Sequence, residues 1–389
     1  MATPRVAARL GYVALYAAVG ASFPFLAVFY ESRGLSIGEI GLLIALSAAA
    51  GLVAAPLWGI LADRVAGSRS ILPFAALLAA GAGGAAAFLD GPLPVALAVI
   101  LMALAFAGLG PTLDASALAA LGGDRDRWGG YRALGSASFI VAVVATGALI
   151  QRAGSASLFA VFVAALVLLA VVTFPLRGTA DDARLPGLSG LRLVLRHPSL
   201  ARFLPAILIV FTASMSVNWF FSIHLLDLGA PGELVGSAWA IGALVEIPIM
   251  WAYPWLTARV GAERLLILGT AAFAARVLVL VLTTDPILAA ASMALHGIGF
   301  ALVLVGAVTY VARHAPSAAA ATAQGVLSAT VFSVAQILGP AIGSWVAGSA
   351  GVSAMFLLSL ALSLVAIPAL WLATRARPDA DLNRVGSHA

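Results

Sequence analysis

Long apolar stretches follow one another along the chain, separated by short polar or Gly/Pro-rich breaks. Each stretch is longer than about 18 residues, which is enough for a helix to cross roughly 30 Å of hydrocarbon. The strands of a membrane barrel would instead alternate apolar and polar residues over segments of about ten. The breaks predict twelve membrane-spanning helices, at residues 8–31, 38–62, 70–89, 94–121, 130–152, 157–177, 199–228, 234–258, 263–283, 287–312, 319–348 and 352–374.

The composition agrees with a polytopic membrane protein. The chain of 389 residues is 62% hydrophobic and 10% charged, with a mean hydropathy of +1.08, whereas soluble domains are about 25% charged. The absence of cysteine excludes a disulfide framework and a thiolate metal site. We expect the first apolar stretch to be a retained helix rather than a cleaved signal peptide, because no clear small-residue cleavage site follows it.

The arginines predict the topology. All 21 basic residues are arginine. If the N-terminus is inside, eighteen fall on the cytoplasmic side, Arg33 and Arg152 fall outside, and Arg276 lies within a predicted span. Such a bias is typical of inner-membrane proteins. We therefore expect both termini in the cytoplasm, and we attribute the high isoelectric point to topology rather than to nucleic-acid binding.

The chain divides into two halves of similar length, at residues 1–177 and 199–375, with a linker at 178–198 and a tail at 376–389. In the linker, Leu188 to Arg196 fits either a short amphipathic helix or a solvated loop. "ADRVAGSR" (62–69) follows the second span, and the similar "TARVGAER" (257–264) follows the eighth. Two related six-helix halves are typical of secondary transporters, which bind substrate near the bilayer midplane.

The loop after the second span carries a recognisable motif. "GILADRVAGSR" (59–69) resembles the loop motif of the major facilitator superfamily, although Ser68 stands where that family often has a basic residue. Gly59 would allow close helix packing. Asp63 would pair with Arg64, Arg69 or a neighbouring helix N-terminus, and so form a latch between the halves in one conformational state.

Two longer stretches narrow the resemblance. Residues 23–64 and "RWGGYRALGSASFIVAV" (127–143) resemble the branch of phenylpropionate permeases and nucleoside–proton symporters, whose layout is similar to that of lactose permease. The resemblance implies an all-α membrane fold, with twelve helices in two pseudo-symmetric six-helix bundles that rock about a central site. It does not identify the substrate, because function within a shared fold depends on the site.

Three ionisable residues, Glu246, Arg276 and His296, fall at similar depth in predicted spans eight, nine and ten. Arg276 would stabilise the charged form of Glu246, while desolvation would favour its protonated form. Lactose permease and its relatives place a Glu, an Arg and a His on these helices, which implies that Glu246 is the proton site and His296 a relay or substrate contact. The alternatives are a structural Glu246–Arg276 pair and a packing role for His296.

Asp114 and Arg132 lie near the inner ends of predicted spans four and five, where they could form a pair. Such a pair would bind substrate, lock a conformation or carry a second proton; the alternative is a structural salt bridge. Uncharged polar residues of the spans are candidate substrate contacts or interhelical hydrogen bonds. They are Tyr12, Tyr16, Ser22, Asn218, Trp219, Gln324, Ser328 and Gln336.

The sequence favours transport over catalysis. It carries no Walker motif, metal-ligand cluster or Ser/His/Asp set, so we expect neither an enzyme nor a cofactor. The leading prediction is a monomeric, proton-coupled importer of a small organic solute, with no nucleic-acid partner. The alternative is a proton-driven exporter of drugs or metabolites. Exporters of the superfamily often carry G-P-x-x-G-G on span five; that span lacks it, and "GPAIGSW" (339–345) resembles it on span eleven.

Overall fold

The computed structural model describes residues 3–64, 71–121, 125–176 and 188–375, and within these ranges the regular structure is helical throughout. The N-terminal half contains α1 (Pro4–Ser22), α2 (Leu26–Ser32), α3 (Ile37–Arg64), α4 (Leu72–Ala86), α5 (Pro92–Phe106), α6 (Leu109–Ala120), α7 (Arg125–Ala153), η1 (Ser155–Ser157) and α8 (Leu158–Thr173). The C-terminal half contains α10 (Pro198–Asp227), α11 (Gly232–Val260), α12 (Ala262–Leu282), α13 (Pro286–Ala291), α14 (Met293–His314), η2 (Ser317–Ala319), α15 (Ala320–Ala329), η3 (Thr330–Val334), α16 (Ala335–Ala350) and α17 (Val352–Arg375).

Helices occupy all twelve of the ranges expected to cross the membrane. Ten of the described helical segments are long and apolar enough to cross, and the bent pair α1 and α2 makes an eleventh if it counts as one span. The remaining range corresponds to α4, which is apolar but has only 15 residues. The all-α membrane fold is thus confirmed. The count of twelve spans stays a prediction, because it requires α4 to cross the membrane as well.

Three spans are interrupted, two of them next to a proline. Pro24 has no backbone N–H, and it lies in the break between α1 and α2, where the axis bends by 41°. Gly108 lies in the break between α5 and α6, and Pro111, which also lacks a backbone N–H, is the third residue of α6. The five-residue π-helix η3 interrupts the eleventh span between α15 and α16, and such segments often occur at functional sites.

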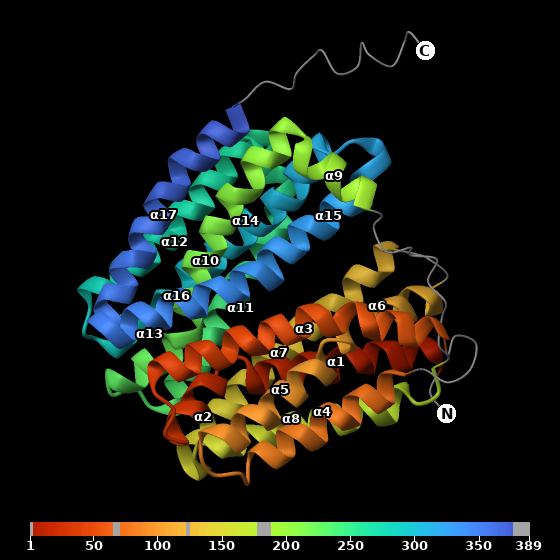
Figure 1. Cartoon of the computed structure of the whole chain (residues 1–389), viewed down its shortest axis with the longest axis vertical. Helices are drawn as coiled ribbons and strands as arrows, with labels where there is room; N and C mark the ends of the chain where they lie inside the picture. Colours follow the sequence, from red (N-terminus) through yellow and green to blue (C-terminus); the bar gives the residue numbers. More distant parts are fainter. Residues whose placement is uncertain (1–2, 65–70, 122–124, 177–187, 376–389) are drawn as a thin grey trace.

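Figure 1 shows the two halves as separate bundles, with the helices of residues 1–176 below and those of residues 198–375 above. We call the side of the membrane that carries the N-terminus the inner side and the opposite side the outer side. The halves pack through α3 against α16, α7 against α11 and α2 against α10. The inner segments α6, α14 and α15 pack mainly within their own halves.

Small residues allow the two halves to approach closely near their outer ends. A Cβ atom on Gly147 would lie 2.5 Å from the Gly232 carbonyl oxygen, and one on Gly236 would lie 2.6 Å from the Val143 carbonyl oxygen. Gly41 similarly contacts Ser344. Close backbone approach through small residues is the usual way in which membrane helices associate. The structure is therefore closed on the outer side.

Helix α9 (Leu188–Arg196) is the part of the linker that the structure describes, and it confirms the helical alternative for this segment. It packs against α10 and α15 at the inner side, with Val194 fully buried and Leu195 exposed. The earlier residues of the linker, 178–187, lie outside the described part of the chain.

Candidate functional site

Two tyrosines on α1 organise the polar centre of the N-terminal half. Tyr12 and Tyr16 are four residues apart, so they lie on the same face of the helix. Their rings stack with centroids 6.4 Å apart. The Tyr12 hydroxyl donates a hydrogen bond to the carboxylate of Asp114 on α6, and the Arg132 guanidinium on α7 donates one of 3.0 Å to the Tyr16 hydroxyl.

Asp114 and Arg132 do not form the direct pair expected from the sequence. Among pairs in which both partners are described, the one salt bridge joins Arg33 and Asp90, near the outer side. Asp114 instead accepts from the Tyr12 hydroxyl, and Arg132 donates to the Tyr16 hydroxyl. The four residues thus form one network from α1, α6 and α7, which we call the N-side cluster. Arg132 is exposed, whereas Tyr16 and Asp114 are half-buried.

A second polar group lies inside the C-terminal half. Arg276 on α12 is 1% exposed, and its Nη1 atom donates to Asn218 Oδ1 at 2.6 Å and lies 3.2 Å from His296 Nδ1. Its guanidinium also stands 4.8 Å from the Phe221 ring centroid, a cation–π contact. Nε and Nη2 have no hydrogen-bond partner among the described residues. We call Asn218, Arg276 and His296 the C-side cluster.

The structural pair of Glu246 with Arg276, one of the alternatives above, is not formed in this conformation. No described residue forms a salt bridge with Glu246, and Arg276 is instead satisfied in part by neutral groups on α10 and α14. Arg276 lies inside its own bundle, where Asn218 and His296 are its polar neighbours. In depth, Glu246 instead matches Arg132 of the opposite half, whose guanidinium donates a hydrogen bond to the Tyr16 hydroxyl.

The antiparallel register of α7 and α11 explains this relation. At the outer side, Gly236 packs on Val143. Glu246 lies ten residues beyond Gly236, and Ala133 lies ten residues before Val143. At 1.5 Å per residue, both are about 15 Å from the outer contact. Glu246 therefore lies level with Ala133 and its neighbour Arg132, on the opposite side of the boundary between the halves.

Aromatic side chains close the outer end of this region. Phe23, at the break after α1, makes edge-to-face contacts with Trp219 at 4.7 Å and Trp239 at 5.4 Å between ring centroids. The Trp219 indole N–H donates to Gln336 Oε1 at 2.7 Å, and the Trp239 indole donates to the Ser222 hydroxyl at 3.0 Å. Trp219 and Gln336, both predicted from the sequence, thus lie together, next to an aromatic residue of the other half.

Other predicted residues lie apart from this region or make local bonds. Gln324 donates to the Val308 carbonyl at 3.0 Å and so ties α15 to α14. The Ser22 hydroxyl bonds within its own helix to Ala18, and Ser328 is exposed on α15.

The structure describes only part of the proposed latch. The expected close packing at Gly59 is absent in this conformation, since a Cβ atom there would meet nothing within 4 Å. Arg64 is exposed at the inner end of α3. The side chain of Asp63, and Arg69 as a whole, lie outside the described part of the chain, so the latch stays a prediction.

Sequence reasoning missed Phe23, Trp239 and Tyr131. Tyr131 packs edge-to-face on Tyr12 at 6.2 Å, and Arg9 stacks on Tyr131 at 5.1 Å. One signal was available for Phe23: it precedes Pro24, which breaks the first span, and it lies seven residues after Tyr16, on the same face of the helix. Trp239 carries no comparable signal among the apolar residues of its span.

The comparisons with known proteins agree with this architecture. The model of the MFS_1 like family matches residues 8–358. A maltose permease from Geobacillus stearothermophilus is 30% identical over 344 residues, which cover 86% of this chain and 84% of the permease. The transporter YwbF from Bacillus subtilis (strain 168) is 24% identical, over 87% of this chain and 84% of its own length.

Solved transporters have the same fold. The nucleoside transporter NupG superposes with a TM-score of 0.82 at 17% identity, covering 97% of this chain and 100% of that one. A bacterial homologue of the lysosomal transporter Spinster, in an inward-facing and occupied conformation, gives 0.74 at 15% identity, over 97% and 98% of the two chains. The chain is thus a multi-pass membrane transporter of a small molecule rather than an enzyme, and it belongs to the MFS_1-like family of the major facilitator superfamily.

Proposed function

We propose that the protein is a proton-coupled symporter, in which Glu246 is the proton site and Arg132 is the charge that responds to it. The observation that carries this proposal is the position of Glu246. It is half-buried at mid-depth, it is free of salt bridges to the described residues, and the α7–α11 register places it level with an arginine of the opposite half. An ionisable residue inside a membrane span is a functional candidate by default, because its burial is costly.

In this proposal, ionisation and protonation of Glu246 drive the conformational cycle of symport. When Glu246 is ionised, its attraction to Arg132 draws α11 towards α7 on the inner side and so favours the conformation that is open to the outside. Protonation removes the charge on Glu246, and substrate competes for Arg132. The inner side then opens, and proton and substrate leave together. The empty carrier, ionised again at Glu246, returns to the outward-open conformation.

The residues around this region suggest the class of substrate. Tyr12, Tyr16 and Trp219 offer aromatic faces, and the Gln336 amide keeps its NH₂ group as a donor, since only its oxygen receives the Trp219 N–H. Aromatic faces with a few polar groups suit a ring-bearing, hydroxyl-rich solute. The names of the relatives, a maltose permease and a nucleoside transporter, point the same way. We propose uptake of a saccharide or nucleoside by a monomer in the inner membrane, with both termini cytoplasmic.

The test is proton current from vesicles on a solid-supported membrane, with pulses of sugars, nucleosides, aromatic acids and cationic drugs. We expect inward current with a sugar or nucleoside, increasing as the external pH falls. Glu246→Gln should lose the current but keep counterflow exchange of the same solute. Glu233→Gln is the matched control, because Glu233 is exposed on the same helix near its outer end.

Three outcomes would contradict the proposal. Full current in Glu246→Gln would remove Glu246 from coupling. Exchange without current in the unaltered protein would indicate a uniporter. Outward movement of a cationic drug against a proton gradient would instead indicate the exporter.

A further inference from the structure

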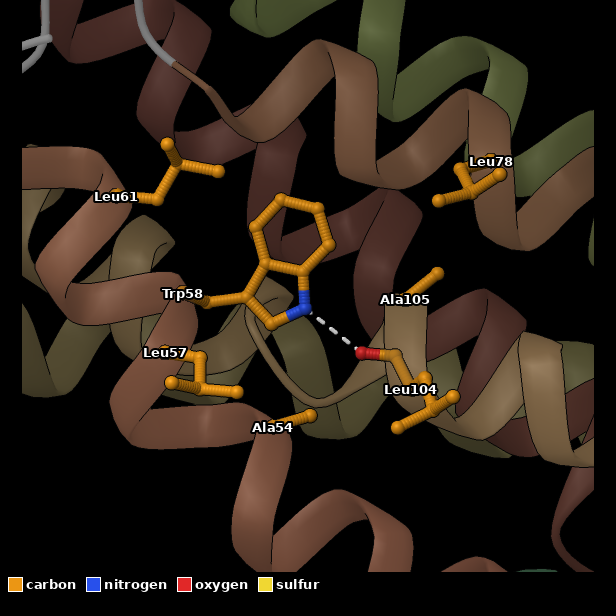
Figure 2. Close-up of a pocket in the computed structure, with 7 residues that line it drawn as sticks. All are labelled: Ala54, Leu57, Trp58, Leu61, Leu78, Leu104 and Ala105. Carbon is orange, nitrogen blue, oxygen red and sulfur yellow. Dashed lines mark hydrogen bonds between the residues drawn. The ribbon is translucent and has the colours of Figure 1, made fainter.

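An apolar groove lies between α3 and α4, with α5 as its floor. It has a volume of about 230 Å³ and is lined by Ala54, Leu57, Trp58, Leu61, Leu78, Leu104 and Ala105. Figure 2 shows the Trp58 ring reaching from α3 across the groove towards α5, with Leu78 of α4 on the far side. Helices α3 and α4 each pack on α5, which leaves the space between them for the groove.

The groove is next to the break in the fourth span. The Trp58 indole N–H donates to the Leu104 carbonyl at 2.7 Å, a group three residues before the break that follows α5 (Figure 2). A Cβ atom on Gly108, inside the break, would lie 2.5 Å from Trp58 Cγ. Glycine is therefore required at position 108 as long as Trp58 occupies this place. Among the described residues that line the groove, the indole N–H is the one polar side-chain group, and it is already bonded.

The surroundings of the groove are apolar and face outward. On α5, Leu97 and Leu101 are exposed on the same side as Leu104, and on α4 the exposed residues include Phe74 and Leu77. In a membrane protein a continuous exposed leucine surface is in contact with lipid. Trp58 lies six residues from the inner end of α3 at Arg64, or about 9 Å. The groove is therefore at the level of the inner leaflet.

We propose that this groove binds the acyl chain of an inner-leaflet lipid, which lies against the Trp58 ring and the α5–α6 break. Water does not suit the space, because a buried water needs two or more polar partners and the indole N–H is already used. An empty groove would leave its lining atoms without dispersion contacts. A flexible hydrocarbon chain, always present at this surface, fills such a space without any polar requirement.

The experiment uses the full-length protein in vesicles that contain phosphatidylcholine with a diazirine in the middle of one acyl chain. After photolysis, the adducts are mapped by mass spectrometry. The comparison surface is Leu364, Val365 and Leu372 on α17, which are as exposed as Leu57 but line no described groove. We expect adducts at the groove residues to exceed those on α17 by about threefold or more per exposed residue, because a bound chain gains several additional dispersion contacts.

Two variants test the groove itself. Ala54→Leu fills it from α3, and Leu57→Phe covers its rim at a position that is 60% exposed and therefore tolerant of substitution. Both should reduce the groove adducts to the level of α17 without changing the α17 adducts. Labelling in proportion to exposure on both surfaces would mean ordinary annular lipid only and would overturn the proposal. Groove labelling that is unchanged in a folded Leu57→Phe protein would overturn it as well.

Discussion

Arg132 on α7 and Arg276 on α12 are both arginines within membrane-spanning helices, but their surroundings are opposite. Arg132 is exposed, bonds to a tyrosine hydroxyl and lies level with a carboxylate of the other half. Arg276 is enclosed in its own bundle, with an amide, an imidazole and an aromatic ring as neighbours.

Because of this difference, we expect Arg132 to change partners during transport and Arg276 to keep its partners. An accessible guanidinium changes partner at low cost, because solvent or substrate can replace a lost bond. A buried guanidinium cannot lose a partner without a large desolvation penalty. We therefore assign the conformational response to the N-side cluster, and we assign to the C-side cluster the fixed positions of α10, α12 and α14. Four predictions follow from this comparison of the two arginines and their clusters.

The largest effect is expected from Asn218→Leu in the C-side cluster. The substitution removes the oxygen that accepts the 2.6 Å bond from Arg276, and it leaves a buried cation with one more unpaired donor. We expect a loss of about 2 kcal/mol in stability, seen as a lower melting temperature in detergent. Ser359→Ala is the control, since it removes a buried neutral bond to Ser216 and should cost clearly less. Equal losses would contradict a fixed charge at Arg276.

Arg132→Gln, unlike Asn218→Leu, should reduce transport without reducing stability. Loss of a charge-assisted partner for substrate and for Glu246 should slow coupled uptake by about 10- to 100-fold. The melting temperature should be unchanged, because Arg132 is exposed. Arg202→Gln, an exposed arginine near the inner end of α10, should have no effect on either quantity. Normal uptake by Arg132→Gln would remove Arg132 from the mechanism.

Gly236→Ala should shift the conformational equilibrium. Its methyl group would meet the Val143 carbonyl at 2.6 Å, so the closed outer side should be destabilised by an overpacking cost of about 1–3 kcal/mol. We expect roughly tenfold more of the outward-open conformation, measured as the labelling rate of a single cysteine that replaces Ser344. Gly81→Ala, where a Cβ atom meets nothing within 4 Å, is the matched control. Identical labelling in both variants would show that the glycine contact does not hold the outer side closed.

The smallest effect is expected from Tyr16→Phe, which keeps the ring but loses the bond from Arg132. A single hydrogen bond of about 1 kcal/mol corresponds to a fivefold weaker apparent substrate affinity. Tyr310→Phe removes a comparable bond to the Ala373 carbonyl, far from the N-side cluster, and should leave transport unchanged. An effect of the same size in both variants would indicate a general loss of stability.

The fold could be predicted from the sequence to a large extent. Span length, the arginine bias and the repeated loop are local signals, and helices occupy every range they indicated. Four of the candidate residues, Tyr12, Asp114, Arg132 and Glu246, lie around one region, and their roles stay predictions. Their pairing was not predictable, because it depends on which half each side chain faces. Depth alone placed Glu246 beside Arg276, whereas the α7–α11 register places it opposite Arg132.

The most direct test of this pairing is a double-mutant cycle on the conformational equilibrium. The chain has no native cysteine, so Ser344→Cys serves as a reporter that is buried while the outer side is closed. Glu246→Gln is combined with Arg132→Gln in one cycle and with Arg276→Gln in another, and the outward-open fraction is measured at a pH where Glu246 is ionised.

If Glu246 responds to Arg132, both single variants should shift the population towards the inward-open state, and the double variant should add little. The interaction energy should then be about 1 kcal/mol or more for the Arg132 cycle and below about 0.5 kcal/mol for the Arg276 cycle. An additive Arg132 cycle with strong coupling between Glu246 and Arg276 would contradict the account and restore the pairing that depth alone suggested.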